Sequence, residues 1–332
     1  MSTGTIVLTG ANGTLGLAYV KAVLKDFQGH HAVLTVRNED PSDVNTTKLK
    51  ETIAAFPDAQ YSIYTLDLAS LDSVRSFAST ITGKVASGEL PAISTIMCNA
   101  FAWSITNGLQ LTGDGYELSF QVNHLSHFAL VLQLLGSIDK SNGRIVVLSS
   151  DSHYPRKNAL EQFPPVFPED IEKLAKPEKD VSGEEVGRGF QRYGLSKLCV
   201  VMFAYELARR LRENSDLRGV TVVASDPGGI PDSRAMAEGV PKLWGMMMKY
   251  VLNPLQPVLK YAAPLRKSAE AGRDLAHLSL GRIHPGKSGY YTMMKIDKSS
   301  PESYEEEKWR LLWKKSVEWS GIKPTDTILL VD

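Results

Sequence analysis

Short apolar runs rich in β-branched residues alternate with longer segments of helical periodicity through most of this chain of 332 residues. Turn-forming residues bound each run, and each is long enough for one buried strand. The runs lie at 5–10, 31–36, 61–66, 93–99, 144–150 and 220–226, with a final strand expected at 289–294. Parallel strands covered by helices on both faces show this pattern, because both sides of each strand are buried. We therefore predict an α/β fold with one doubly wound parallel sheet flanked by helices.

Three segments depart from this alternation. Residues 151–192 separate a strand from its expected helix and contain five prolines, so we interpret them as an insertion over a site. Residues 230–264 mix prolines with apolar side chains, which is typical of a deformable substrate lid. A helix at about 302–319 is expected within a C-terminal extension at 299–332. We predict that all of these segments belong to a single domain over 1–332.

The charge balance and the cysteines limit the classes of partner. Lys plus Arg (37) equals Asp plus Glu (37), so we expect no nucleic-acid partner. Cys98 and Cys199 lie in apolar runs, which predicts buried free thiols in a reducing compartment. With no signal-peptide pattern and no long apolar window, we expect a cytoplasmic chain without a transmembrane segment. The methionines at 246–248 favour an adaptable apolar pocket, while peripheral membrane contact stays open.

A glycine-rich turn follows the first strand. The sequence Thr-Gly-Ala-Asn-Gly-Thr-Leu-Gly at 9–16 leads into a helical segment. Glycines permit a tight turn and bring backbone amides close to a pyrophosphate at the positive end of the helix. Strand, turn and helix together favour dinucleotide binding over a purely structural turn. The residues assigned to the cofactor here are Gly10, Asn12, Gly13, Thr14, Leu15 and Gly16.

The end of the second strand indicates which dinucleotide binds. An acidic side chain at this position binds the ribose 2′-hydroxyl of NAD, whereas a basic one accommodates the 2′-phosphate of NADP. The chain has Arg37 followed by Asn38, so we predict NADP(H). The alternative is that Arg37 is a surface residue and that Glu39 or Asp40 has the acidic role.

Tyr193 and Lys197 open a helical pattern that runs to Leu211. Their i, i+4 spacing places the phenol and the ammonium on one helix face. A free phenol titrates near pH 10, and a nearby cation lowers its pKa. Such a pair also occurs on exposed helix faces, so its meaning depends on the accompanying motifs.

Those motifs occur in order along the chain. Asp67 and Leu68 follow the third strand, Asn99-Ala100 the fourth and Val-Leu-Ser-Ser the fifth, while Val-Asn-His-Leu-Ser-His-Phe lies on a helix and Pro-Gly-Gly ends the last central strand. With the glycine turn and the Tyr–Lys pair, this set resembles the short-chain dehydrogenase/reductase family over about 5–229 and near Tyr290. Arg37 and the Asn-His-Leu-Ser-His-Phe helix are most similar to the NADPH-linked branch of retinol dehydrogenases and protochlorophyllide reductases.

The resemblance implies a Rossmann fold, a function and a set of site residues. The implied catalytic residues are Asn123, Ser150, Tyr193 and Lys197, without a metal. The implied further cofactor contacts are Asp67, Leu68, Asn99, Ala100, Tyr193, Lys197, Pro227, Gly228 and Gly229. The implied reaction is carbonyl reduction, in which the cofactor delivers hydride and Tyr193 the proton. Ser150, rather than Ser149, would hydrogen-bond the carbonyl oxygen, and Asn123 would hold a water that passes protons to Lys197.

The chain also departs from the family pattern. Cys98 and Phe101 replace the first Asn and the Gly of the Asn-Asn-Ala-Gly motif, and Gly229-Ile-Pro-Asp-Ser233 replaces the usual Thr after Pro-Gly. We therefore consider two functions. The first is reduction of a ketone or aldehyde, or oxidation of the alcohol, of a bulky hydrophobic molecule such as a polyketide-like, steroid-like or retinoid-like compound. The second is a non-redox role, as a cofactor-sensing module or a cyclisation catalyst. Oligomeric state stays open.

Three other motifs are weak. Residues 281–288 match the phosphate-loop pattern but precede a strand rather than a helix. His124 and His127 share a helix but lack a third metal ligand at a suitable spacing. His153 lies close to Ser150, yet the chain contains no Gly-x-Ser-x-Gly elbow of a hydrolase.

Overall fold

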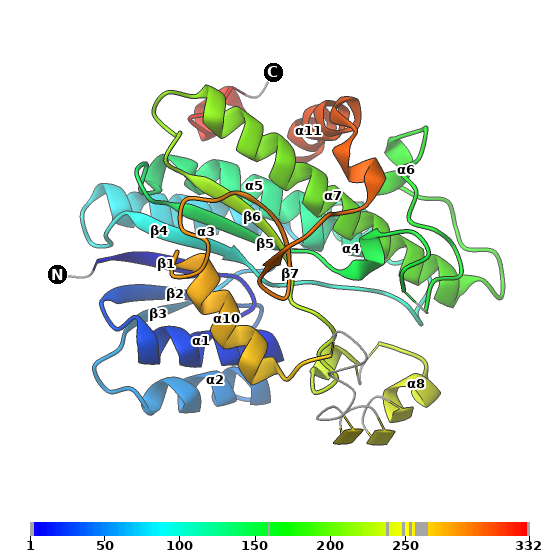
Figure 1. Ribbon diagram of the computed structural model, residues 1–332, viewed down its shortest axis with the longest axis horizontal. Helices are drawn as coiled ribbons and strands as arrows, with labels where there is room; N and C mark the ends of the chain where they lie inside the picture. Colours follow the sequence, from blue (N-terminus) through cyan, green and yellow to red (C-terminus); the bar gives the residue numbers. More distant parts are fainter. Residues whose placement is uncertain are drawn as a thin grey trace.

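A computed structural model places one mostly parallel sheet between two layers of helices (Figure 1). It describes residues 3–158, 160–236, 239–247, 250–251, 254–255 and 265–330. The strand order is β3-β2-β1-β4-β5-β6-β7-β8, and among these pairs only β7 and β8 are antiparallel. This confirms the predicted doubly wound fold; the short β8 is an addition that the sequence pattern did not indicate.

The strand bounds are β1 Gly4–Leu8, β2 His30–Val36, β3 Gln60–Thr65, β4 Ile93–Cys98, β5 Arg144–Leu148, β6 Thr221–Asp226, β7 Gly289–Thr292 and β8 Lys295–Ile296. Strands β1, β5 and β6 are buried along their whole length, as expected for the centre of a parallel sheet. Several predicted runs extend one or two residues past the observed strand. Those extra residues form the turns at the carboxyl edge, where doubly wound folds bind ligands.

Helices cover both faces of the sheet. One face packs against α1 Thr14–Asp26, α2 Val44–Ala54 and α10 Ser268–Ser279. The other packs against α3 Leu71–Ala86, α5 Ser126–Leu134 and α7 Glu185–Glu213, with α11 Glu306–Ser320 outside α5 and α7. The short helices are α4 Leu118–Phe120, α6 Glu172–Ala175 and α8 Lys242–Met247. Both predicted free thiols are confirmed as buried, Cys98 under one helical layer and Cys199 within α7.

Helix α7 begins at Glu185, eight residues before the predicted opening at Tyr193. Its first turns pack closely against the loop after β4, because a Cβ at Gly189 would overlap the carbonyl oxygen of Ser104. Arg192 in this extension is buried and forms an ion pair with Asp180. The irregular part of the predicted insertion is therefore confined to the residues before Glu185, since tertiary contacts stabilise a glycine-rich helical start.

The predicted C-terminal helix is present. It starts with a 3-10 turn, Pro301–Tyr304, continues as α11 and ends where Gly321 adopts a φ of +66°. A glycine in this left-handed conformation is a common helix terminator.

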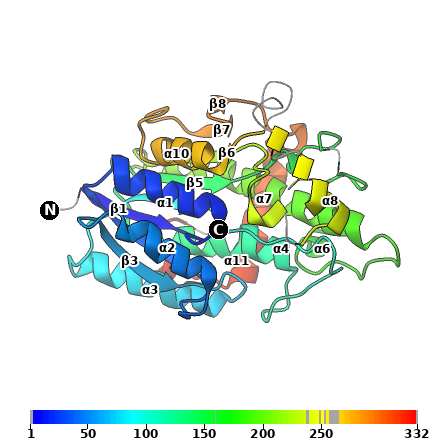
Figure 2. The same cartoon turned by 90° about the horizontal axis from the view of Figure 1, so that it is seen from below.

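The predicted lid at 230–264 lies partly outside the described residues. Within its described part, α8 lies beyond the carboxyl ends of the strands (Figures 1 and 2). Leu243, Met246 and Met247 are exposed on it, whereas Met248 is not described. Over the described ranges, every helix is too short or too polar to cross a lipid bilayer.

Candidate active site

The turn between β1 and α1 has the shape that the glycine motif requires. Gly10 has a φ of +67°, and its Cα faces Ala100, where an added Cβ would crowd the alanine. A Cβ at Gly16 would overlap the carbonyl oxygen of Gly10. Helix α1 begins at Thr14, so its free N-terminal amides face the carboxyl edge of the sheet. This cradle fits the pyrophosphate of a dinucleotide.

Asn99 and Ala100 hold the same turn from the neighbouring strand. The side-chain amide of Asn99 donates to the carbonyl oxygens of Thr9 at 2.8 Å and Gly10 at 3.2 Å. In return, Thr9 Oγ1 accepts the backbone N–H groups of Asn99 at 2.9 Å and Ala100 at 3.0 Å. Four hydrogen bonds thus fix the glycine turn against β4.

The end of β2 is tied to the glycine turn. Asn12 Nδ2 donates to Thr46 Oγ1 at 2.9 Å, and Thr46 Oγ1 donates to the carbonyl oxygen of Asn38 at 2.8 Å. Arg37 follows β2 directly, and its side chain is exposed. The geometry therefore places a free cationic side chain one residue from the anchored Asn38.

Asp67 and Leu68 lie at the same edge, after β3. Asp67 Oδ1 accepts the backbone N–H of Ala69 at 3.0 Å, which shapes a tight turn. Leu68 is buried, and its carbonyl oxygen accepts the Ser126 hydroxyl at 2.6 Å. In the strand order these residues lie on the β3 side of the glycine turn, away from β4.

Ser150, Tyr193 and Lys197 come together at the carboxyl end of β5. The Lys197 Nζ donates to the carbonyl oxygen of Leu148 at 2.9 Å and lies 5.6 Å from the centroid of the Tyr193 ring. A hydrogen bond links the Ser150 and Tyr193 side chains. The predicted serine is therefore the one that faces the phenol, while Ser149 Oγ is directed to the carbonyl oxygen of Lys197 at 3.4 Å.

Burial controls the charge of these groups. It lowers the pKa of Lys197 to about 7, because the ammonium loses water, while the charge of Asp226 acts in the opposite direction. Burial also raises the pKa of the Tyr193 phenol, and the hydrogen bond with Ser150 partly offsets this. The Tyr193 phenol is thus kept protonated at neutral pH.

Asn123 lies in a π-helical turn, Gln121–Leu125, between α4 and α5. Its Oδ1 accepts the backbone N–H of Ala102 at 2.8 Å, and its Nδ2 donates to the Ala102 carbonyl at 3.0 Å and to Ser196 Oγ at 2.9 Å. Ser196 lies in α7 between Tyr193 and Lys197. Asn123 therefore joins the loop after β4 to the helix that carries the Tyr–Lys pair. Such π-helical turns are frequent at functional sites.

The Pro227, Gly228 and Gly229 turn follows β6 on the same edge. Gly228 has a φ of +83°, and its N–H donates to Asp226 Oδ1 at 2.8 Å. The Gly229 carbonyl oxygen accepts the backbone N–H of Arg266 at 2.9 Å. The turn is therefore anchored on both sides.

Sequence reasoning missed two features of this site. The first is Asp226, which is 7% exposed and whose pKa burial raises to about 6. The sequence feature that could have indicated Asp226 is its position as an acidic residue at the end of the apolar run 220–226. The second is a group of rings around Tyr193, in which Phe101 is joined by Trp103 and Phe190. The sequence indicates only Phe101, because Trp103 and Phe190 lie outside the Asn-Ala motif.

The other histidines have structural contacts. His124 Nε2 is hydrogen-bonded to Ser316 Oγ at 2.8 Å and His127 Nε2 to Thr9 Oγ1 at 3.0 Å, so the two imidazoles contact different elements. His153 Nδ1 contacts the Ser150 carbonyl oxygen at 2.5 Å, and its Nε2 accepts the N–H of Ser300 at 3.1 Å. The turn at 281–288 leads into β7, not into a helix.

Comparisons with known proteins agree with this geometry. Residues 4–159 match the family model for short chain dehydrogenases, and residues 236–329 match a model for the AcuH dehydrogenase domain. The chain is 32% identical to the short-chain dehydrogenase iccH of Talaromyces variabilis, covering 98% of each chain. It is 29% identical to protochlorophyllide reductase A of Hordeum vulgare, covering 96% of this chain and 81% of the relative. This chain belongs to the short-chain dehydrogenase/reductase family.

The fold is shared with solved structures at lower identity. The structure of the angucycline C-6 ketoreductase LanV with bound NADP superposes on this chain with a TM-score of 0.58, at 15% sequence identity. The alignment covers 88% of this chain and 94% of LanV. These structures share the fold, while the sequence relatives make the chain an oxidoreductase of this family. The similarity to protochlorophyllide reductases agrees with the resemblance of Arg37 and the Asn-His-Leu-Ser-His-Phe helix.

Proposed function

We propose that the chain is an NADP(H)-dependent reductase of a ketone or aldehyde on a bulky hydrophobic small molecule, with the reverse alcohol oxidation open to the same site. The observation that carries this proposal is the meeting of Ser150, Tyr193 and Lys197 beside the glycine turn. A cofactor-sensing module would not require a buried proton donor next to a buried lysine.

Each residue has a separate role in the proposed reaction. A bound nicotinamide cofactor supplies the hydride. Tyr193 donates its proton to the carbonyl oxygen, and Ser150 hydrogen-bonds that oxygen and the phenol. Lys197, 5.6 Å from the centroid of the phenol ring, stabilises the phenolate that proton transfer leaves. Asn123 fixes the loop and helix on either side; both of its amide hydrogens bond to protein atoms, so a water relay would use its remaining Oδ1 lone pair.

Arg37 supports NADP(H) over NAD(H). Its guanidinium is exposed beside the cradle, where the 2′-phosphate of NADP would lie. The acidic alternatives are engaged locally: Glu39 Oε1 accepts the Thr65 hydroxyl at 2.9 Å, and Asp40 Oδ1 accepts the N–H and hydroxyl of Ser42 at 2.8 and 2.7 Å. The NADP bound in the LanV structure points in the same direction.

The Tyr193→Phe variant tests the reaction. We expect its turnover of NADPH with bulky ketones, aldehydes or quinones to fall by about 10²-fold or more, because the proton donor is lost. Binding of NADPH, followed by its fluorescence, should be retained. Near-normal turnover in this variant would contradict the assignment of Tyr193.

A further inference from the structure

We propose that Phe101 and Trp103 form an aromatic wall of the carbonyl pocket and select substrates that carry a planar conjugated ring near the carbonyl. This inference rests on the proposed reductase function and specifies its substrate class. The ring centroid of Tyr193 lies 6.1 Å from that of Phe101 and 5.2 Å from that of Trp103. The two wall residues meet edge to face, with centroids 5.8 Å apart and an interplanar angle of 90°.

Part of the wall is exposed at Phe101, whose ring lies close to the Tyr193 phenol. Phe101 is 40% exposed, although the neighbouring Tyr193 is 8% and Phe190 is 4% exposed. Covering an exposed ring removes apolar surface from water, which favours any apolar group that binds there. Because Tyr193 must reach the carbonyl oxygen, the part of the substrate close to the carbonyl is the part that meets Phe101.

The wall is held rigidly. Ala102, between the two rings, is bonded through both its N–H and its carbonyl oxygen to the amide of Asn123, at 2.8 and 3.0 Å. Behind it, Gly189 of α7 closely approaches the backbone of Ser104. Gly239, from the segment 230–264, lies against the indole of Trp103. A surface fixed before binding loses little conformational entropy when a ligand covers it.

Ring chemistry determines what this surface prefers. Aromatic rings gain from offset or edge-to-face contact with other rings, beyond the gain from buried area alone. A saturated ring of the same carbon count buries similar area but lacks the quadrupole and is thicker. The wall therefore favours a flat sp² ring over its saturated counterpart. The Lys197 ammonium lies 5.5 Å from the Phe101 ring centroid and forms a cation–π contact with this ring.

The test compares 4-phenylbutan-2-one with 4-cyclohexylbutan-2-one, which share the carbonyl environment and differ only in the ring. Binding of each to the protein saturated with NADP is measured by calorimetry, and turnover of each is measured with NADPH. We expect the wild-type protein to favour the phenyl ketone by roughly threefold to tenfold in affinity and in kcat/KM.

Variants assign that preference to the wall. Phe101→Leu and Trp103→Leu should each bring the phenyl-to-cyclohexyl ratio close to one, whereas Phe101→Tyr, which keeps a ring, should preserve it. Tyr61→Leu, at an exposed aromatic residue on β3, is the matched control and should leave the ratio unchanged.

The two readouts separate this inference from the reductase proposal. A ratio near one in the wild-type protein, or a ratio unaffected by both leucine variants, overturns the aromatic wall. A clear affinity ratio without NADPH oxidation supports the wall and counts against the reductase function. Absence of binding by both ketones also overturns the wall.

Discussion

Asp226 shows how a single side chain connects the two halves of the site. Its carboxylate accepts the Gly228 N–H and so shapes the turn beside the cofactor cradle. Its negative charge also favours the charged form of Lys197 and disfavours the phenolate of Tyr193. The motif residues could be predicted from sequence, because their types and order are distinctive. The role of Asp226 could not, since it depends on burial and on a lysine from another element.

The Asp226→Asn variant separates the charge of this residue from its hydrogen bond. Asparagine retains an acceptor for Gly228 but removes the charge that raises the pKa of Lys197, so that pKa should fall below about 7. Because the ammonium is the active form, the alkaline decline of kcat/KM should move to lower pH, by about one unit. A pH profile of kcat/KM measures the shift.

Two further variants complete that comparison. Asp226→Ala removes both the charge and the acceptor of the Gly228 N–H, so it should shift the pH profile and also raise the KM for NADPH. Asp72→Asn, at an exposed carboxylate on α3, should leave the profile unchanged. An unshifted profile in Asp226→Asn would show that Asp226 has no electrostatic influence on Lys197.

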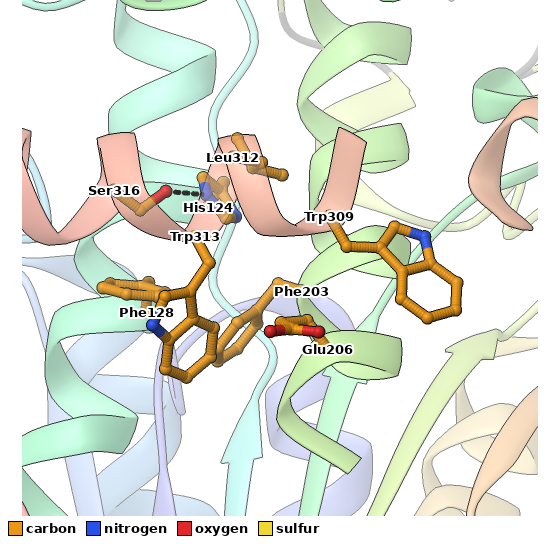
Figure 3. Close-up of a pocket in the computed structure, with 8 residues that line it drawn as sticks. All are labelled: His124, Phe128, Phe203, Glu206, Trp309, Leu312, Trp313 and Ser316. Atoms are coloured by element: carbon orange, nitrogen blue, oxygen red, sulfur yellow. Dashed lines mark hydrogen bonds between the residues drawn. The ribbon is translucent and has the colours of Figure 1, made fainter. Parts of the chain in front are cut away.

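At the scale of the elements, α11 packs against α5 and α7 outside the site. Its Trp313 lies against Phe128 of α5 and Phe203 of α7, with ring centroids 5.0 and 6.2 Å away (Figure 3). The Arg210 guanidinium carbon lies 4.3 Å from the Trp313 ring centroid. Ser316 of the same helix bonds to His124. Periodicity predicted that α11 packs, but its partners required the fold, because they come from distant segments.

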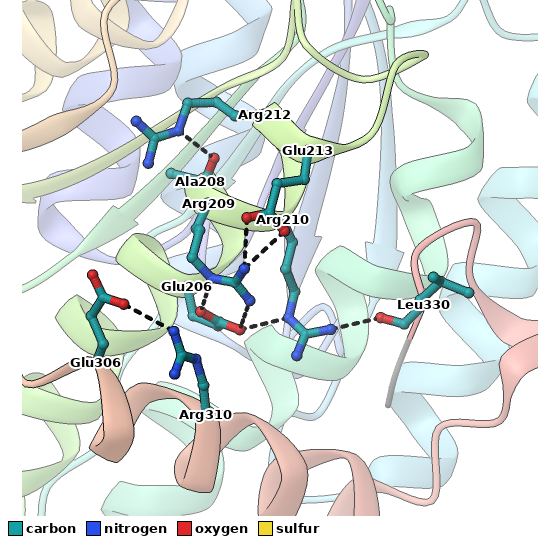
Figure 4. A network of polar contacts seen from close by, with 9 residues as sticks. All are labelled: Glu206, Ala208, Arg209, Arg210, Arg212, Glu213, Glu306, Arg310 and Leu330. Atoms are coloured by element: carbon teal, nitrogen blue, oxygen red, sulfur yellow. Dashed lines mark hydrogen bonds and ion pairs between the residues drawn. The ribbon is translucent and has the colours of Figure 1, made fainter.

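Beneath α11, a buried carboxylate in α7 is neutralised within its own helix. Glu206 accepts from Arg209 at 2.7 and 2.8 Å and from Arg210 at 2.7 Å (Figure 4). Burial alone would raise the pKa of Glu206, but these hydrogen bonds outweigh it and hold that pKa below its usual value. Arg210 also donates to the carbonyl oxygen of Leu330 at 2.9 Å, which ties the last described residues to α7.

Removal of the Trp313 ring should therefore be costly. We expect Trp313→Ala to lower the free energy of unfolding by about 3–5 kcal/mol, because a large fully packed ring leaves a cavity. Leu311→Ala on the same helix, where the side chain is 41% exposed, should cost less than about 1 kcal/mol. Urea denaturation of both variants measures the difference, and equal small losses would show that α11 is only loosely attached.

At the scale of the whole molecule, the sheet and the order of its motifs were predictable because each buried strand has a continuous apolar sequence. The start of α7 was not, because Gly187 and Gly189 weaken helix propensity and only contacts with neighbouring loops stabilise a helix there. The group of rings around Tyr193 was not predictable either, because Phe101 and Trp103 come from the loop after β4 and Phe190 comes from α7. What the sequence alone did not indicate is where separate segments meet, as they do in the group of rings around Tyr193.

The most direct test of the account is isotope transfer from NADPH that carries deuterium at the transferable C4 position. With a panel of bulky ketones and aldehydes, we predict a product alcohol with one deuterium on the former carbonyl carbon, formed faster with NADPH than with NADH and suppressed in Tyr193→Phe. Tight binding of NADPH with no deuterium transfer to any member of the panel would contradict the central claim that this site reduces carbonyl groups.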